Sequence, residues 1–184
     1  LGVEFVFGVP GGSIEPLYNA LARSERNGGP KAVIARHETG AAFMADGYAR
    51  ATGKPGVAYV ITGPGLCNVM TPMGQAYSDS VPVLVLSSCL DETAARKGQL
   101  HQMKDQRAAA ETVCDWSEVA LTAPAAYQLI DRALTEFASA RARSKHISVP
   151  IHLLEAEAAP AKPMSVSATR PAGDPAQIKA LAQK

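Results

Sequence analysis

The fold is decided by the stretch Arg36-His37-Glu38-Thr39-Gly40-Ala41-Ala42-Phe43-Met44-Ala45-Asp46-Gly47-Tyr48-Ala49-Arg50. Small and apolar side chains recur in it at helical spacing, which predicts a helix from near Glu38 to Gly53, a residue type that suits a helix end. Short apolar runs at 32–35 and 56–61 lie on either side of this helix and predict strands. A strand, a helix and a second apolar strand are the repeating unit of a parallel sheet.

The same alternation continues along the rest of the chain. Ser13 has the position of an N-cap, and the polar segment 91–107 predicts a long loop or short irregular helices. Strands that are apolar on both faces indicate a parallel sheet covered by helices on both sides, so we predict an α/β, doubly wound fold whose strand order stays open. The further predicted strands are 3–9, 82–86, 116–121 and 146–154, and the further predicted helices are 14–21, 68–77 and 125–142.

The composition excludes several classes of protein. The chain has 184 residues and a formal net charge of +1, so it lacks the positive charge of a nucleic-acid-binding protein. Its hydrophobic fraction of 47% is too high for a disordered chain, and no apolar run approaches the roughly 18 residues that span a bilayer. Three cysteines, an odd number, indicate reduced thiols in a cytoplasmic protein. We therefore expect neither nucleic acid nor a membrane among its partners.

Three regions are expected along the chain. Residues 1–155 form the α/β domain, and 156–173, rich in Ala, Pro and Ser, predict a linker. Residues 174–184 begin with Asp174-Pro175, a pair typical of a helix start, and are interpreted as the beginning of a truncated further domain. Because the sequence also lacks an initiator Met, we expect it to be a fragment.

Three segments fall where ligands bind in an open α/β sheet, at the carboxyl ends of strands. They are residues 9–12, 37–38 and 62–68, and their shared placement predicts that they converge on one ligand. The glycine turns in them suit either a tight connection or close approach of the backbone to a flat ligand. A dinucleotide-binding loop is disfavoured, since Asn68 stands at the third glycine position and Pro64 removes an N–H donor.

Glu38 and the polar loop each allow two interpretations. An acid at a helix N-terminus stabilises the helix by about 0.3–1 kcal/mol, whereas a carboxyl group among the small residues 40–42 can exchange a proton near neutral pH. His37 suits a surface or orienting histidine better than a catalytic one. His101 and Gln102 lie in the polar loop, which is either solvated or functional.

Taken together, these motifs resemble those of a known enzyme family. FGVPGG at 7–12, the stretch 36–56, TGPGLCN at 62–68 and DSVPVL at 79–84 resemble the N-terminal pyrimidine-binding domain of thiamine-diphosphate enzymes of the acetolactate synthase type. The resemblance covers about residues 1–155, with the family's first helix largely missing, and residues 174–184 resemble the entry to its middle domain.

The resemblance implies roles for individual residues. Glu38 matches the family's catalytic glutamate, which hydrogen-bonds N1′ of the aminopyrimidine and so promotes formation of the thiazolium ylid that decarboxylates a 2-oxo acid. The product is released as an aldehyde or joined to a second carbonyl compound. Positions that line the pyrimidine match Thr62, Pro64, Gly65 and Asn68, the loop near the thiazolium matches Pro10, Gly11 and Gly12, and a glutamine facing the active site matches Gln102.

The resemblance also implies partners and a substrate class. In the family, two subunits of a homodimer or homotetramer share the site, and the partner's C-terminal domain holds the diphosphate and Mg²⁺. His101 stands where acetolactate synthases have an aromatic residue, so the sequence resembles the guanidino-2-oxopentanoate decarboxylase branch. A noncatalytic interaction domain of the same fold is the alternative, and the presence of Glu38 argues against it.

Overall fold

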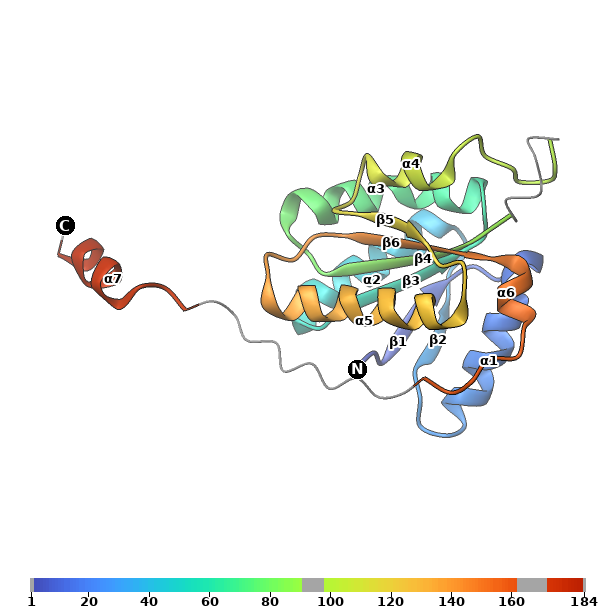
Figure 1. Cartoon of the computed structure of the whole chain (residues 1–184), viewed down its shortest axis with the longest axis horizontal. Helices are drawn as coiled ribbons and strands as arrows, with labels where there is room; N and C mark the ends of the chain where they lie inside the picture. The colour runs from blue at the N-terminus through green and yellow to red at the C-terminus, as the bar shows by residue number, and fades with distance from the viewer. Residues whose placement is uncertain (1, 91–97, 162–171, 184) are drawn as a thin grey trace.

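A single parallel sheet organises the chain, whose computed structural model describes residues 2–90, 98–161 and 172–183 (Figure 1). Its strand order is β2-β1-β3-β4-β6-β5, and each neighbouring pair is parallel. The α/β prediction is therefore confirmed. The strands are β1 (Phe5–Gly8), β2 (Lys31–Ile34), β3 (Gly56–Val60), β4 (Val83–Cys89), β5 (Ser117–Val119) and β6 (Lys145–Pro150).

Helices cover both faces of the sheet, as Figure 1 shows for α3 and α4 on one side and α5 on the other. One buried cluster joins the sheet to α2, α3 and α4, and a second joins it to α1 and α5. The helices are α1 (Glu15–Glu25), α2 (Glu38–Thr52), α3 (Pro64–Asp79), α4 (Gln106–Glu111), α5 (Ala123–Ser139), α6 (Ile151–Glu155) and α7 (Pro175–Ala182), with a 3-10 turn, η1 (Gly12–Ile14), before α1.

The strand order places a topological switch point between β1 and β3. The chain leaves β1 toward β2 on one side, and β3 then pairs with the other side of β1. Ligands of doubly wound sheets bind outside the carboxyl ends of strands at such a point, where successive connections diverge. The turn at 11–12 follows β1 and the turn at 62–65 follows β3, so both border this crevice.

Small residues let α2 pack directly on the sheet. Ala41, Ala42 and Ala45 have no exposed surface. A Cβ added to Gly56 would lie 2.1 Å from the carbonyl oxygen of Ala45, which is closer than any real contact. The predicted helix end is also confirmed, because Gly53 has φ 72° and its N–H donates to the carbonyl of Ala49.

Two local predictions are wrong. The expected strand 146–154 ends at Pro150, which lacks an N–H to continue the ladder, and α6 follows. A short apolar run does not distinguish strand from helix, which explains the error. Ser13 is not the N-cap of α1: it lies inside η1, and its hydroxyl bonds the Ser88 hydroxyl at 2.9 Å.

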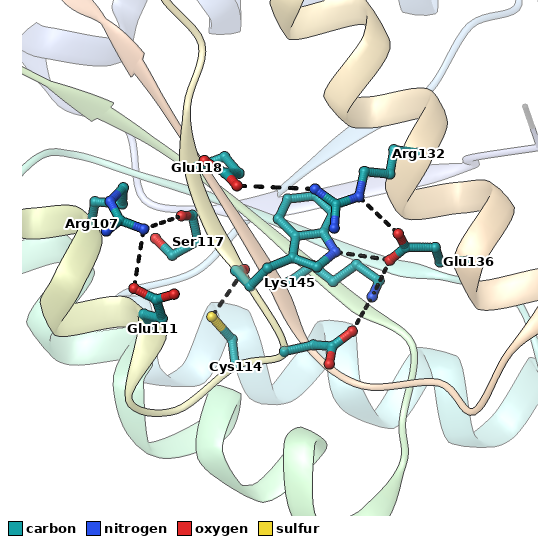
Figure 2. Close-up of polar contacts among 10 residues, drawn as sticks. Arg107, Glu111, Cys114, Ser117, Glu118, Arg132, Glu136 and Lys145 are labelled. Atoms are coloured by element: carbon teal, nitrogen blue, oxygen red, sulfur yellow. Dashed lines mark hydrogen bonds and ion pairs between the residues drawn. The ribbon is translucent and has the colours of Figure 1, made fainter.

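A charged cluster lies at the opposite end of the sheet, where β6 begins. Lys145 is 1% exposed, and its ammonium lies 2.7 Å from Asp115 and 2.7 Å from Glu136. Figure 2 shows Glu136 of α5 in contact with both Arg132 of the same helix and Lys145 of β6. Burial raises the pKa of Glu136, but hydrogen bonds from Lys145, Trp116 and Arg132 outweigh it and lower the pKa to about 2. This cluster ties α5 to the sheet.

The predicted linker and further domain are described only in part. Residues 162–171 lie outside the described residues, so the linker prediction is not tested. The predicted helix start is confirmed, since the Asp174 side chain accepts from the Ala176 N–H at 2.8 Å and α7 begins at Pro175. Within the described ranges, none of the helices combines the length and the apolar character that crossing a membrane requires.

Candidate functional site

A cavity of about 380 Å³ opens at the switch point. Four of the predicted site residues line it: Gly11 and Gly12 after β1, Thr62 after β3, and His101 from the polar loop. These segments are far apart in the sequence, so the tertiary structure brings the cofactor-side and substrate-side predictions together. The remaining lining residues are Ser13, Ile61, Leu90, Gln99, Leu100 and Ile151.

The side chain of Ile61 is the reason why two positions of the site must be glycine. A Cβ on Gly11 would lie 2.7 Å from its Cγ2, and a Cβ on Gly65 would lie 2.7 Å from its Cγ1. Ile61 is β-branched and stiff, so it cannot yield cheaply to either. Gly12 differs, because a Cβ there would meet nothing within 4 Å. Gly11 and Gly65 therefore make room for Ile61, while Gly12 leaves open space at the cavity.

Position 63 requires glycine for a different reason. It has φ 66°, and a Cβ on it would lie 2.1 Å from the carbonyl oxygen of His101. His101 itself has φ 66°, an uncommon conformation for a residue with a side chain. The 98–102 turn of the polar loop therefore docks on the 62–65 turn through backbone contact. This close approach by the chain itself gives no support to the dinucleotide alternative.

Glu38 and Asn68 form a direct pair on the cofactor side. The Asn68 amide Nδ2 donates to Glu38 Oε2 at 2.9 Å, and the Thr39 hydroxyl donates to the Asn68 carbonyl at 2.5 Å. Glu38 is the first residue of α2, and His37 caps that helix by accepting from the Thr39 N–H at 3.2 Å. The orienting interpretation of His37 is therefore confirmed, and the pair holds the Glu38 carboxyl group at the N-termini of α2 and α3.

Tyr18 of α1 lies near Glu38 and was predicted only as part of a helix face. Burial, with a smaller contribution from the negative charge of Glu38, raises the pKa of Tyr18 to about 12. Its hydroxyl is buried and has no hydrogen-bond partner among the described residues. A buried phenol usually has such a partner, so Tyr18 offers a neutral donor in the neighbourhood of Glu38.

Gln106 is the polar residue that the sequence analysis missed. Its Oε1 accepts from Thr62 Oγ1 at 2.9 Å and from the Gly63 N–H at 3.0 Å. Its Nε2 lies 2.8 Å from the Ser88 carbonyl, and 3.0 Å from each of the hydroxyls of Ser87 and Ser148. The one available signal was Asp105, whose side chain caps α4 and marks its start. Nothing in the pattern distinguishes Gln106 itself.

His146 extends this polar network into the sheet. It is fully buried, and its ring nitrogens lie 2.8 Å from the Ser87 hydroxyl and 2.7 Å from the Ser117 hydroxyl. Burial lowers its pKa to about 3, so the imidazole is neutral. Ser87 on β4 and Ser117 on β5 are thus joined behind the site by a neutral histidine.

Several predicted site residues lie outside the cavity lining among the described residues. Pro10 and Pro64 are exposed and do not line it. The Gln102 side chain accepts from the backbone N–H groups of Gly98 at 2.8 Å and Gln99 at 3.2 Å, so it closes the 98–102 turn. Glu38, Asn68 and Gly65 also lie beyond the lining.

Comparisons with known proteins agree with this geometry. Residues 1–109 match the family model described as "Thiamine pyrophosphate enzyme, N-terminal TPP binding domain". The chain is 49% identical over 160 residues, 86% of its own length, to the probable 2-ketoarginine decarboxylase AruI of Pseudomonas aeruginosa, and covers 28% of that protein. It is 48% identical over 93 residues, 50% of its length, to an acetolactate synthase of Arthrospira platensis, covering 16% of it.

A third relative is the mitochondrial acetolactate synthase catalytic subunit of Saccharomyces cerevisiae, 47% identical over 92 residues, which are 50% of this chain and 13% of that protein. The chain thus spans less than a third of the length of each of these relatives. The family match covers the strands β1, β2, β3 and β4 and both glycine turns, which together form the switch point. The chain belongs to the thiamine pyrophosphate enzymes and carries their N-terminal TPP binding domain.

Proposed function

We propose that this chain binds the aminopyrimidine end of thiamine diphosphate in a 2-oxo acid decarboxylase or carboligase. The observation that carries the proposal is the pair of Glu38 and Asn68, 2.9 Å apart at the N-termini of two helices beside the switch point. The site fits a flat heteroaromatic group, because Gly12 leaves open space, the cavity measures about 380 Å³ and the Tyr18 hydroxyl is buried. Thiamine diphosphate, when bound, supplies the electron sink for the bond broken in decarboxylation.

The chain's own residues would orient the cofactor and exchange a proton with it. Asn68 occupies Oε2 of Glu38, and among the described residues nothing hydrogen-bonds Oε1, which is therefore the atom that would exchange a proton with a ring nitrogen of the pyrimidine. The buried Thr62 and the 62–65 turn would form a wall of the pyrimidine site, with Pro64 and Gly65 at its end. Pro10, Gly11 and Gly12 would border the thiazolium, where the cavity lies.

The substrate that we propose is a 2-oxo acid with a guanidino side chain. One relative, which matches 86% of this chain, is named as a probable 2-ketoarginine decarboxylase. In addition, His101 lines the cavity. Ser13 and Gln99 add neutral hydrogen-bonding groups to a lining that is otherwise largely apolar, and these groups, with His101, could bind the polar end of such a side chain. Gln102, two residues from the lining residue Leu100, would reach the substrate only after the 98–102 turn rearranges.

A second subunit completes the site in this proposal. Leu100 is 81% exposed although it lines the cavity, and Pro10, Gly12 and Pro64 are also exposed, which suits coverage by another chain. We propose a homodimer or homotetramer in the cytoplasm, with Mg²⁺ and the diphosphate held by the partner's C-terminal domain. Residues 156–173 would be the linker to a middle domain that begins with 174–184.

Two measurements on the full-length protein test the proposal. In the first, exchange of the C2 proton of bound cofactor is followed by NMR, and Glu38→Gln is expected to slow it by at least about 100-fold. Unchanged exchange would remove Glu38 from its proposed role. In the second, carbon dioxide release is compared for pyruvate, benzoylformate and 5-guanidino-2-oxopentanoate. We expect the guanidino acid to have the largest kcat/KM, and a preference for pyruvate would contradict the substrate proposal.

A further inference from the structure

We infer that Gln106 is a positioning residue that holds the 62–65 turn and the polar loop in one arrangement. The inference rests on the proposed function, in which that turn borders the cofactor and the loop borders the substrate. Gln106 is 44 residues from Thr62 and 43 from Gly63, yet its carboxamide bonds both. One side chain therefore joins the two halves of the site.

Two backbone groups dictate which way the carboxamide points. The Gly63 N–H, 3.0 Å away, can only donate, so the atom facing it is Oε1. The Ser88 carbonyl, 2.8 Å away, can only accept, so the atom facing it is Nε2. A flipped side chain would oppose like groups at both contacts. The orientation of Gln106 is thus set by the ends of β3 and β4.

The strand side of the network is a rigid anchor. Ser87 and Ser148 are 0% and 1% exposed, and both hydroxyls lie 3.0 Å from Gln106 Nε2. Ser87 accepts from Gln106, so its own hydrogen is available to His146 Nε2 at 2.8 Å, and His146 Nδ1–H then donates to Ser117. Groups buried to this degree have no water to replace a lost partner, so each contact resists displacement.

On its other side, the network connects the buried serines to the cavity through Thr62. Thr62 is 3% exposed and lines the cavity, its hydroxyl donates to Gln106 Oε1, and its N–H donates to Ser88 Oγ at 2.9 Å. Ser88 Oγ also bonds Ser13 Oγ at 2.9 Å, and Ser13 lines the cavity too. Residues that follow β1 and β3 are therefore joined to the end of β4 in one network that ends at Gln106.

The described part of the polar loop, from residue 98 onward, is fixed at two points to the same turn. Its first contact is the His101 carbonyl against Gly63, and its second is Gln106, the first residue of α4. Residues 102–105 lie between these two contacts, and they directly follow in sequence Gln99, Leu100 and His101, which line the cavity. Releasing the second contact frees the loop and the turn together. Cofactor affinity and substrate affinity should therefore change in the same variant.

The test compares two substitutions in the full-length protein. Gln106→Met keeps the length of the side chain and removes all its hydrogen bonds, whereas Gln106→Glu keeps an acceptor for Thr62 and Gly63 and loses the donor to Ser88. Calorimetric titration with thiamine diphosphate and Mg²⁺ gives the Kd, and initial rates at saturating cofactor give KM and kcat for the oxo acid. We expect Gln106→Met to raise both Kd and KM by roughly tenfold or more, with a smaller change in kcat.

Gln106→Glu keeps the acceptor for the turn but turns a second oxygen toward the Ser88 carbonyl, 2.8 Å from the present Nε2, so it should raise Kd and KM at least as much as Gln106→Met. Gln128→Met, the same substitution at an exposed position of α5, is the control and should leave Kd and KM unchanged. Ser148→Ala removes one acceptor of Nε2 and provides a milder test if Gln106→Met does not fold; it should raise Kd and KM in the same direction, by less than tenfold.

The outcomes separate the inference from the proposed function. If wild type does not bind thiamine diphosphate, the proposed function is wrong whatever Gln106 does. If wild type binds it, and Gln106→Met loses thermal stability but has unchanged Kd and KM in its folded fraction, Gln106 is only structural and the inference fails. An unchanged Kd for Gln106→Glu would also contradict it, since the contact with the Ser88 carbonyl would then have no effect on the turn.

Discussion

Asn68 Nδ2 lies 2.9 Å from Oε2 of Glu38, so the fifth residue of α3 orients the first residue of α2. The two residues are 30 positions apart in the sequence. Hydrogen bonds to an ionised carboxylate are among the stronger contacts in proteins, which makes this pair sensitive to single substitutions.

Removing the amide should impair the orientation of Glu38. We expect Asn68→Ala to lower kcat/KM by roughly 10- to 100-fold, the effect of losing a hydrogen bond of about 1.5–3 kcal/mol to a charged group. The measurement is steady-state decarboxylation by the full-length protein at saturating cofactor. Asn19→Ala, on the exposed face of α1, serves as the control. Equal kcat/KM for the two variants would show that the pair has no part in the activity.

Gly63 and Gly53 allow backbone strain to be separated from steric conflict. Both have positive φ, 66° and 72°, but only a Cβ on Gly63 would collide, with the His101 carbonyl 2.1 Å away. Gly53→Ala should cost about 1 kcal/mol of unfolding free energy and leave KM alone. Gly63→Ala should cost more and raise KM, because the polar loop must move. Urea unfolding and initial rates check both, and an unchanged KM for Gly63→Ala would contradict the docking of loop on turn.

Gly11 and Gly12 are adjacent but should respond differently. Gly11→Ala is expected to lower the melting temperature, since its methyl group would lie 2.7 Å from Ile61 Cγ2. Gly12→Ala meets nothing within 4 Å and should leave the melting temperature within a few degrees of wild type, while its methyl group occupies the cavity and weakens cofactor binding. Thermal unfolding without ligand and calorimetric titration distinguish the two. Tight cofactor binding by Gly12→Ala would show that the thiazolium lies elsewhere.

Acid should destabilise the domain through His146. Burial lowers its folded-state pKa to about 3 from the ordinary value of 6.5, so the unfolded chain binds the proton first as the pH falls. The stability that the neutral ring supports is present above pH 6.5 and is lost progressively between 6.5 and 3. Between pH 7 and about pH 5 we expect a loss of about 2 kcal/mol in urea unfolding.

A matched variant assigns that loss to one histidine. His146→Gln removes the titrating group and should flatten the dependence of unfolding free energy on pH, even if its stability at pH 7 is lower. His37→Gln, at an exposed position, should keep the wild-type slope. If the slope of His146→Gln equals that of wild type, the acid sensitivity comes from other groups.

Much of this molecule follows from its sequence. The alternation of apolar runs and helical periodicities predicted six strands of a parallel sheet, because strands buried on both faces need apolar residues throughout. Glu38 was singled out by its position at a helix start beside a strand end, and Gly11, Gly12, Thr62 and His101 now line one cavity. The family match over residues 1–109 agrees with the resemblance that those motifs indicated.

Other features depended on contacts between distant residues. The strand order, the collision that keeps Gly63 a glycine, and the role of Gln106 involve groups at least 18 positions apart, which no local pattern records. Ser13 shows the same limit, since its hydroxyl has a partner 75 residues away on β4.

Local spacing therefore determined which segments become strands and helices, because hydrophobic periodicity is a property of neighbours along the chain. Tertiary structure alone decided which polar atoms meet at the end of the sheet, because a buried hydrogen-bonding group takes whichever partner the packing of the strands brings within reach.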